Sequence, residues 1–337
     1  MKRRVLYFEK PYCVNVRDES VAPLARDAVL VETIFSAISA GTELLFYRGQ
    51  VPANMAVDAN LNALAGQMQY PLAYGYACVG RVMECGANVA REWHNRLVFA
   101  FQPHASHFVC APDELVCLPE TIAPHVAAFL PNMETAVNFV MDGAPLAGEN
   151  VCVLGQGVVG LLTTALLTQM LPARVLAFDR FAKRRAFANQ FGAHDAFDPM
   201  NENEIARARA ILDTNGADLT YELSGNPDAL NLAIALTGFG GRIVIGSWYG
   251  EKRAALDLGG AFHRSRIRLV SSQVSTIAPE HAARWSKARR MQVAWQMLER
   301  VDVVRMISHR IPLEDAASAF TMLDTQPQDA LQILFTY

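Results

Sequence analysis

The sequence lacks the segments that direct a chain into a membrane or onto nucleic acid. Its basic start at residues 1–4 is followed by the short apolar run Val5–Phe8, then by charged residues and Pro11, so the apolar region of a signal peptide is missing. The longest apolar run, Leu161–Leu171, is too short to cross a bilayer. No long basic tract occurs in this chain of net charge −3. We therefore expect a cytoplasmic protein that binds neither membranes nor nucleic acid.

The sequence also lacks paired cysteines. Its six cysteines include no Cys-x-x-Cys pair, and their spacing matches no zinc ribbon. Free cysteines in a reducing compartment are usually small buried hydrophobic residues. The 337-residue chain is 52% hydrophobic and 19% charged, which is typical of a globular protein with about two domains.

What the sequence does contain is a Gly-x-Gly-x-x-Gly turn between a short β-branched strand, Val151–Leu154, and a long apolar helix. Gly155 permits the tight turn, Gly157 lets the backbone approach a pyrophosphate, and Gly160 lets the helix pack closely on the strand. The amides at the start of the helix face the phosphate charge. The residues predicted to bind the cofactor here are Gly155, Gln156, Gly157, Val158, Val159 and Gly160.

A second apolar strand, Arg174–Phe178, follows the helix and ends at Asp179. A carboxylate about 20 residues past the last glycine is placed to accept the ribose hydroxyls and to repel a 2′-phosphate, which favours NAD(H). The basic neighbours that follow, Arg180 first among them, can hold a phosphate, so NADP(H) remains open. The order of strand, turn, helix, strand and acid predicts a dinucleotide site.

Two later turns follow predicted strands at the edge where ligands of open α/β sheets bind. Ser224 and Gly225 come after the strand Leu219–Leu223, and Gly246 and Ser247 come after Arg242–Ile245. We predict that these turns contact the cofactor.

The strand pattern changes along the chain. Up to about residue 120, short strands alternate with glycine and proline, which predicts a small all-β barrel. A short helix covering this region is expected at Asp58–Met68. From Val151 onward, strands alternate with helices, which predicts a doubly wound parallel sheet. We place the first domain at residues 1–124 and 274–337 and the nucleotide-binding domain at 125–273.

The order of these motifs resembles the medium-chain dehydrogenase/reductase superfamily across essentially the whole chain. The matching segments are Gly41–Glu43, Gly75–Gly80, Leu154–Gly160, Asp179, Glu222–Pro227 and Gly240–Val244. The resemblance implies an α/β protein that joins a GroES-like β-barrel to a Rossmann doubly wound parallel sheet and transfers hydride to or from a nicotinamide. It also implies a homodimer, formed by edge pairing at Arg268–Ser271.

Within the superfamily, the chain is more similar to the zinc alcohol, polyol and threonine dehydrogenases than to the quinone reductases. The Ser-x-Gly-Thr-Glu form at residues 39–43 resembles the branch containing hydroxyethyl bacteriochlorophyllide dehydrogenase.

The ligand positions of the zinc enzymes are replaced in this chain. The segment equivalent to their cysteine, residues 36–43, contains none, and Tyr76 and Ala77 stand where the resemblance places a histidine and a glutamate. The third ligand position falls near Pro131. Because zinc needs about three protein donors plus water, we expect no metal site. The alternative is a rearranged site built from His104, His107, Cys78 and Glu43.

Without zinc, a side chain must stabilise the negative charge that develops on the carbonyl oxygen. Tyr76 is the first candidate, and the alternative is a packing tyrosine. Glu43 could relay a proton, or it could bind an arginine or a backbone amide structurally. Glu134, near Asn132 at the start of a helix that faces the nicotinamide in the family, could polarise the substrate or simply favour the helix dipole. His104 is a candidate general acid.

We therefore expect a zinc-independent, NAD(H)-dependent oxidoreductase of the alcohol dehydrogenase type (EC 1.1.1.-) that acts on a secondary alcohol or its ketone. Tyr47, Arg48, Asn54 and the extra segment Val51–Gln69 suggest a sugar-like or larger substrate. One alternative is an NADPH-dependent enoyl or quinone reductase, against which Asp179 argues. The other is a catalytically silent nucleotide-binding protein, suggested by the lost ligand positions.

Overall fold

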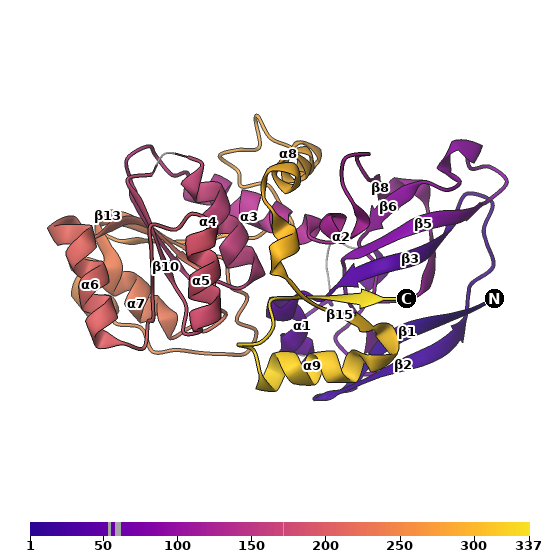
Figure 1. Ribbon diagram of the computed structural model, residues 1–337, viewed down its shortest axis with the longest axis horizontal. Coiled ribbons are helices and arrows are strands. Elements are labelled where there is room, and N and C mark those ends of the chain that lie inside the picture. Colours follow the sequence, from indigo (N-terminus) through magenta and orange to yellow (C-terminus); the bar gives the residue numbers. More distant parts are fainter. Residues whose placement is uncertain (53–54, 58–61, 171) are drawn as a thin grey trace. The chain divides into compact units, whose positions relative to one another are not determined.

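The computed structural model describes residues 1–52, 55–57, 62–170 and 172–337 (Figure 1). The chain forms two compact units: Met1–Pro131 with Leu298–Tyr337, and Asn132–Met297. The domain limits predicted from the sequence assign residues 125–131 and 274–297 to the opposite units. In the described residues, no helix is long and apolar enough to cross a membrane.

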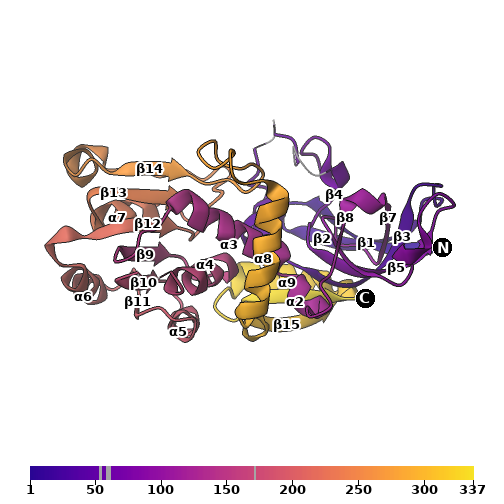
Figure 2. The same ribbon diagram turned by 90° about the horizontal axis from the view of Figure 1, so that it is seen from above.

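The second unit contains a six-stranded sheet in the order β11-β10-β9-β12-β13-β14, in which every pair is parallel. Figure 2 shows the strands in this order. Their bounds are β9 Asn150–Leu154, β10 Arg174–Phe178, β11 Asp195–Phe197, β12 Ala217–Glu222, β13 Thr237–Ile245 and β14 Arg268–Ser271. The order is that of a doubly wound dinucleotide-binding fold, whose two halves meet between β9 and β12. The predicted fold class is confirmed.

Helices cover both faces of this sheet because its strands are apolar on both sides. The helices are α3 Leu130–Gly143, α4 Val158–Thr168, α5 Ala182–Gln190, α6 Glu202–Leu212 and α7 Ala229–Leu236. On β9, Val151 and Val153 pack with residues of α3 and α4, whereas Cys152 and Leu154 pack with residues of α6 and α7. The strand period of two therefore places neighbouring side chains in separate cores.

The first unit contains two sheets, β2-β1-β4 and β15-β16-β3-β5-β6-β8, with β7 also paired to β3. The strands are β1 Lys2–Lys10, β2 Cys13–Ser20, β3 Val29–Ala37, β4 Leu72–Ala73, β5 Cys78–Cys85, β6 Leu97–Ala100, β7 His107–Cys110, β8 Leu115–Cys117, β15 Ile307–Pro312 and β16 Gln332–Thr336. All of the pairs are antiparallel except β15 with β16. The strands β15 and β16, from the end of the chain, therefore belong to a sheet of the first unit.

An aromatic core fixes the first helix of this unit. The helices here are α1 Ala40–Tyr47, α2 Pro124–Ala127 and α9 Ala316–Thr325, and α8 Lys287–Arg300 spans the unit boundary. In Figure 1, α9 runs beside β2. Phe46 of α1 stacks on Tyr74 with ring centroids 3.9 Å apart, and Phe8 meets Phe320 of α9 edge-on at 5.1 Å. These contacts hold α1, which carries Thr42 and Glu43, in place.

The helix predicted at Asp58–Met68 is wrong where it can be compared. Residues 58–61 lie outside the described residues, and the rest forms a short 3-10 turn at Asn62–Leu64. Gly66 has a φ of +143°, a backbone conformation that ends any helix. The apolar spacing that suggested a helix instead places Leu64 and Met68 against the core.

Candidate active site

The glycine turn joins β9 to α4, and a Cβ at each of its three glycines would meet different surroundings. Gly155 has a φ of +92°, and a Cβ at this position would lie 2.5 Å from Cα of Ser224. A Cβ at Gly160 would lie 1.9 Å from the carbonyl oxygen of Gly155. At Gly157, the first atom of the described chain that a Cβ would meet is Nη1 of Arg184, at 3.9 Å. Gly155 and Gly160 are thus required by packing, whereas Gly157 leaves open space beside the start of α4.

This open position fits a phosphate group. Gly157 is the N-cap of α4, and no side chain of the described residues caps the helix there. The first amides of a helix need an acceptor and favour negative charge. Val158 and Val159, in the first turn, are partly exposed. The residues present therefore fit the pyrophosphate of a dinucleotide.

The Asp179 carboxylate links the end of β10 to the glycine turn. Its Oδ2 accepts a hydrogen bond from the Gln156 amide at 2.8 Å, and its Oδ1 accepts one from the Phe181 amide at 2.9 Å. Nη1 of Arg184 lies 3.9 Å from Oδ2, and the guanidinium of Arg180 lies 4.5 Å from the Phe181 ring centroid. The predicted acid and its basic neighbour are thus at the turn.

Gln156 contributes to the turn through its backbone. Its side chain is fully buried, with Nε2 donating to the carbonyl of Val153 at 3.1 Å and Oε1 accepting from the Thr164 hydroxyl at 3.1 Å. The amide side chain therefore ties β9 to α4 and points away from any ligand.

The two later turns are bonded to each other at the ends of β12 and β13. The Gly225 amide donates to Oγ of Ser247 at 2.9 Å, and the Gly246 amide donates to the carbonyl of Glu222 at 3.1 Å. Sequence reasoning cited Glu222 only as part of a motif and did not identify Tyr249. The fully buried Glu222 carboxylate accepts the Ser224 amide at 2.8 Å with Oε1 and the Tyr249 hydroxyl with Oε2.

In the first unit, Tyr76 and Ser39 are hydrogen-bonded. Tyr76 was predicted to replace a metal ligand, and Ser39 lies in the segment where the zinc enzymes carry a cysteine. The Tyr76 hydroxyl bonds to Oγ of Ser39 and lies 3.3 Å from Oγ1 of Thr42. All three residues are partly exposed. These three residues thus form a hydroxyl cluster, which is Tyr76, Ser39 and Thr42.

Glu43 and His104 are joined in a separate network directly behind this cluster. His104 Nε2 lies 2.9 Å from Glu43 Oε2, and His104 Nδ1 lies 2.6 Å from Oγ of Ser36, which is in turn 2.6 Å from the hydroxyl of Tyr337. The Glu43, His104 and Ser36 side chains are completely buried. A serine, a histidine and an acid that are hydrogen-bonded one after another resemble a nucleophilic triad. Because Ser36 is buried, a substrate cannot reach it.

This buried network positions the hydroxyl cluster. The second oxygen of Glu43, Oε1, accepts the backbone amide of Ser39 at 2.7 Å. Gly75 makes room for the imidazole, because a Cβ there would lie 2.6 Å from Cδ2 of His104. The two candidates that sequence reasoning named for acid–base roles thus meet each other, and Glu43 also accepts the Ser39 amide.

The rearranged metal site is not assembled. His107 lies in β7 with Nε2 3.9 Å from Oε1 of Glu32, and the Cys78 thiol donates to the Gln102 carbonyl at 3.2 Å. Burial raises the pKa of the Cys78 thiol, which disfavours the thiolate that a metal binds. Among the residues with described positions, no three His, Cys, Asp or Glu side chains gather to hold a metal.

Glu134 is in a buried ion pair. Its Oε1 accepts from Nη2 of Arg290 at 2.9 Å and from Nε at 3.1 Å, and Arg290 is completely buried. Arg290 also donates to Oδ1 of Asn138 and to the Thr276 carbonyl. Burial raises the pKa of Glu134 although the Arg290 charge opposes this. These contacts join α3 to α8.

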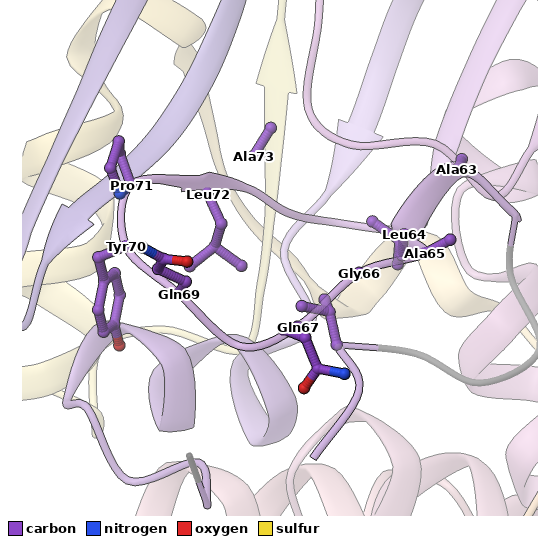
Figure 3. Close-up of a pocket in the computed structure, with 11 residues that line it drawn as sticks. Ala63, Leu64, Ala65, Gly66, Gln67, Gln69, Tyr70, Pro71, Leu72 and Ala73 are labelled. Carbon is purple, nitrogen blue, oxygen red and sulfur yellow. The ribbon is translucent and has the colours of Figure 1, made fainter. Parts of the chain in front are cut away.

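The side chains that suggested a polar substrate have internal partners. Tyr47 is buried and stacks on Phe320, and Nε of Arg48 donates to Oδ1 of Asp324 at 2.6 Å. Asn54 lies outside the described residues. Val57 and residues 63–67 and 69–73 line a pocket of about 420 Å³ in the first unit (Figure 3).

The sequence is similar to known dehydrogenases over part of its length. Residues 158–291 match the zinc-binding dehydrogenase family model. The chain is 26% identical over 211 residues to an L-threonine 3-dehydrogenase of Bacillus subtilis, covering 61% of this chain and 56% of that protein. It is 24% identical over 299 residues to a D-guloside 3-dehydrogenase of Escherichia coli, covering 84% of each. The match to the threonine enzyme thus spans little more than half of its length.

Two solved structures share the fold of this protein over the whole chain. An alcohol dehydrogenase from Escherichia coli, crystallised with NADH, superposes with a TM-score of 0.80 at 16% identity, covering 100% of this chain and 99% of that one. A protein from Sinorhizobium meliloti described as a zinc-binding dehydrogenase, solved with NADP, gives 0.77 at 19% identity and covers 100% of both. At these identities the solved structures show that this chain shares their fold, a barrel-like antiparallel unit joined to a six-stranded parallel sheet.

Proposed function

We propose that this protein is an NAD(H)-dependent oxidoreductase that interconverts a secondary alcohol and its ketone without zinc. The observation that carries this proposal is the hydrogen bond between Tyr76 and Ser39, at positions where the resemblance places metal ligands. The same chain keeps a glycine turn whose Gly157 leaves room for a ligand. Loss of the ligand positions has thus not been accompanied by loss of the nucleotide turn.

The nicotinamide cofactor, when bound, supplies or takes up the hydride. In our proposal the amides at the start of α4 hold its pyrophosphate, and Asp179 accepts the hydroxyls of a ribose. The turns Ser224–Gly225 and Gly246–Ser247 bind the other half. Asp179 favours NAD(H) because a carboxylate repels a 2′-phosphate, whereas Arg180 and Arg184 make binding of NADP(H) the competing outcome.

The proton comes from the hydroxyl cluster in this proposal. The Tyr76 hydroxyl donates to the carbonyl oxygen as negative charge develops there. The Ser39 and Thr42 hydroxyls can then stabilise the charge left on the phenol oxygen by hydrogen bonding. Glu43 and His104 act as positioning residues, because neither side chain is exposed to a substrate. Glu134 holds α3 through Arg290.

The substrate class and the assembly are finer proposals. The pocket lining includes Gln67 and Gln69, of which Gln69 lies next to Tyr70 (Figure 3). These two amides and the likeness to a D-guloside dehydrogenase favour a polyhydroxylated substrate. The likeness to the bacteriochlorophyllide branch rests on the motif at residues 39–43 alone. β14 is an edge strand whose Leu269 is 37% exposed, which favours a homodimer through strand pairing.

The test is a metal analysis of the purified protein beside calorimetric titrations with NADH and NADPH. Absence of stoichiometric zinc, with tighter binding of NADH, supports the proposal. Stoichiometric zinc overturns its metal-free part, and binding of neither nucleotide overturns it altogether. A panel of polyols, ketones, quinones and enoyl compounds then separates the dehydrogenase from the reductase and from a silent binding protein.

Tyr76→Phe tests the proposed proton donor. Removing a general acid lowers turnover by about 10²- to 10⁴-fold, and NADH binding stays unchanged. The matched control is Tyr12→Phe, whose ring is 59% exposed. Full turnover by Tyr76→Phe would leave Tyr76 as a packing residue only.

A further inference from the structure

The buried Glu222 carboxylate connects two turns that are far apart in sequence. Its Oε1 accepts the Ser224 amide at 2.8 Å and the Ser224 hydroxyl, while its Oε2 accepts the Tyr249 hydroxyl. Burying a carboxylate is unfavourable unless its oxygens are hydrogen-bonded, and here both are. Glu222 is completely buried, so its carboxylate acts on the two turns and not on the solvent side.

The turns themselves are bonded around this carboxylate. The Ser247 hydroxyl accepts the Gly225 amide at 2.9 Å, and Nζ of Lys252 donates to the Gly225 carbonyl at 2.8 Å. Gly225 has a φ of +70°, a conformation that other residues adopt rarely. The loop after β12 is therefore fixed to the loop after β13 by side chains.

The strand order gives these turns a place in the cofactor site. In the order β11-β10-β9-β12-β13-β14, the glycine turn and Asp179 follow β9 and β10, in the first half of the sheet. The turns that carry Ser224 and Ser247 follow β12 and β13, in the second half. Each half of a doubly wound sheet binds one mononucleotide of the cofactor. The first half, with the glycine turn and Asp179, binds the adenosine part, so the second half binds the nicotinamide part.

We propose that Glu222 and Tyr249 are positioning residues that fix the turns binding the nicotinamide half of the cofactor. The inference rests on the proposed function, because it assumes a nicotinamide dinucleotide. Neither residue touches the cofactor; they act through the backbones of Ser224 and Gly225. Their loss therefore weakens ligands that contain nicotinamide and spares ligands that fill only the adenosine half.

The test is isothermal titration of wild type, Tyr249→Phe, Glu222→Gln and the double variant with NADH and with ADP. We expect Tyr249→Phe to raise the Kd for NADH about tenfold, the loss that follows from an unpaired oxygen on a buried carboxylate, and to leave the Kd for ADP within about twofold. Because the two residues act as a unit, the double variant should bind NADH no more weakly than the weaker single variant.

Thr220→Val is the matched control. Thr220 lies on the same strand, is completely buried, and its hydroxyl bonds to that of Thr237 at 2.8 Å, away from the turns. It should lower thermal stability without changing the Kd for NADH. If Glu222→Gln fails to fold, Tyr249→Phe alone decides.

The outcomes separate this inference from the proposed function. NADH bound equally by wild type and Tyr249→Phe overturns the positioning role of Tyr249 and Glu222 and leaves the proposed function standing. Equal weakening of NADH and ADP also overturns it, because the pair would then only stabilise the sheet. Wild type that binds neither NADH nor ADP overturns both.

Discussion

Nε2 of His104 lies 2.9 Å from Oε2 of Glu43, and both side chains are completely buried. The other oxygen of Glu43 accepts the Ser39 amide, and the Ser39 hydroxyl bonds to Tyr76. The placement of the proposed proton donor therefore depends on a buried acid that does not touch the phenol. This relationship can be tested without knowing the substrate's identity in full.

Glu43→Gln should lower both stability and turnover but leave cofactor binding unchanged. A glutamine cannot accept at both ends, so Ser39 or His104 loses a partner, and the free energy of unfolding should fall by about 2 kcal/mol. A displaced Tyr76 should lower kcat by about tenfold or more, while NADH affinity is unchanged. Urea titration and steady-state kinetics measure these effects. Glu32→Gln, whose side chain is 51% exposed, is the control, and wild-type kcat and stability in Glu43→Gln would contradict the positioning role.

Gly157→Ala should lose cofactor and keep the fold. A Cβ there comes no closer than 3.9 Å to Arg184 and its φ is −70°, so the melting temperature should stay near that of wild type. The methyl group would occupy the space proposed for the pyrophosphate and raise the Kd for NADH about tenfold or more. Gly160→Ala, with its 1.9 Å clash, should instead fail to fold. NADH affinity that survives Gly157→Ala would place the phosphates elsewhere.

Arg290→Met should lower the free energy of unfolding by more than a substitution on the surface does. It leaves the buried Glu134 carboxylate without its guanidinium, and breaking a buried pair in this way costs about 3 to 5 kcal/mol. Arg290→Lys should rescue little, because an ammonium cannot reach Glu134, Asn138 and the Thr276 carbonyl together. Chemical denaturation measures both variants against Arg289→Lys, an exposed neighbour. A stable Arg290→Lys would show that charge alone suffices.

Acid should abolish the contribution of Glu149. Burial alone would raise its pKa, but hydrogen bonds from Arg242 and the Leu146 amide outweigh this and lower the pKa below 4.5. A carboxyl whose folded pKa is lowered stabilises the protein above its unfolded pKa and loses that contribution as the pH falls through the folded pKa. Glu149→Gln should therefore destabilise the protein at pH 7, and the difference from wild type should shrink as the pH falls below 4.5. Urea titration across that range measures it, with the exposed Asp302→Asn as control; a difference that is constant with pH would contradict it.

Local pattern was enough to predict the fold and the tight glycine turn between β9 and α4. The strands around Val151 and Val175 are apolar on both faces, and Gly160 is required by the carbonyl oxygen of Gly155, five residues before it. This information is contained in a short stretch of sequence, whereas the contact of Gly155 with Ser224, in the turn after the neighbouring strand β12, is not.

The environment of the candidate side chains could not be predicted in this way. His104 meets Glu43 across 61 residues, and Arg290 meets Glu134 across 156. Nothing local to Glu134 distinguishes a free carboxylate at a helix start from one paired with a distant arginine. Tyr249 belongs to no motif, and only the tertiary fold brings its hydroxyl to Glu222.

The buried set of Ser36, Glu43 and His104 also constrains how related chains can differ. Each member satisfies another's hydrogen-bonding atoms, so replacing one alone leaves a buried polar group without its partner, which costs more than changing bonded partners together. Substitution at these positions should therefore be all-or-none across descendants of this chain. Gly75 should be retained together with these three residues, because any larger residue there displaces the imidazole of His104.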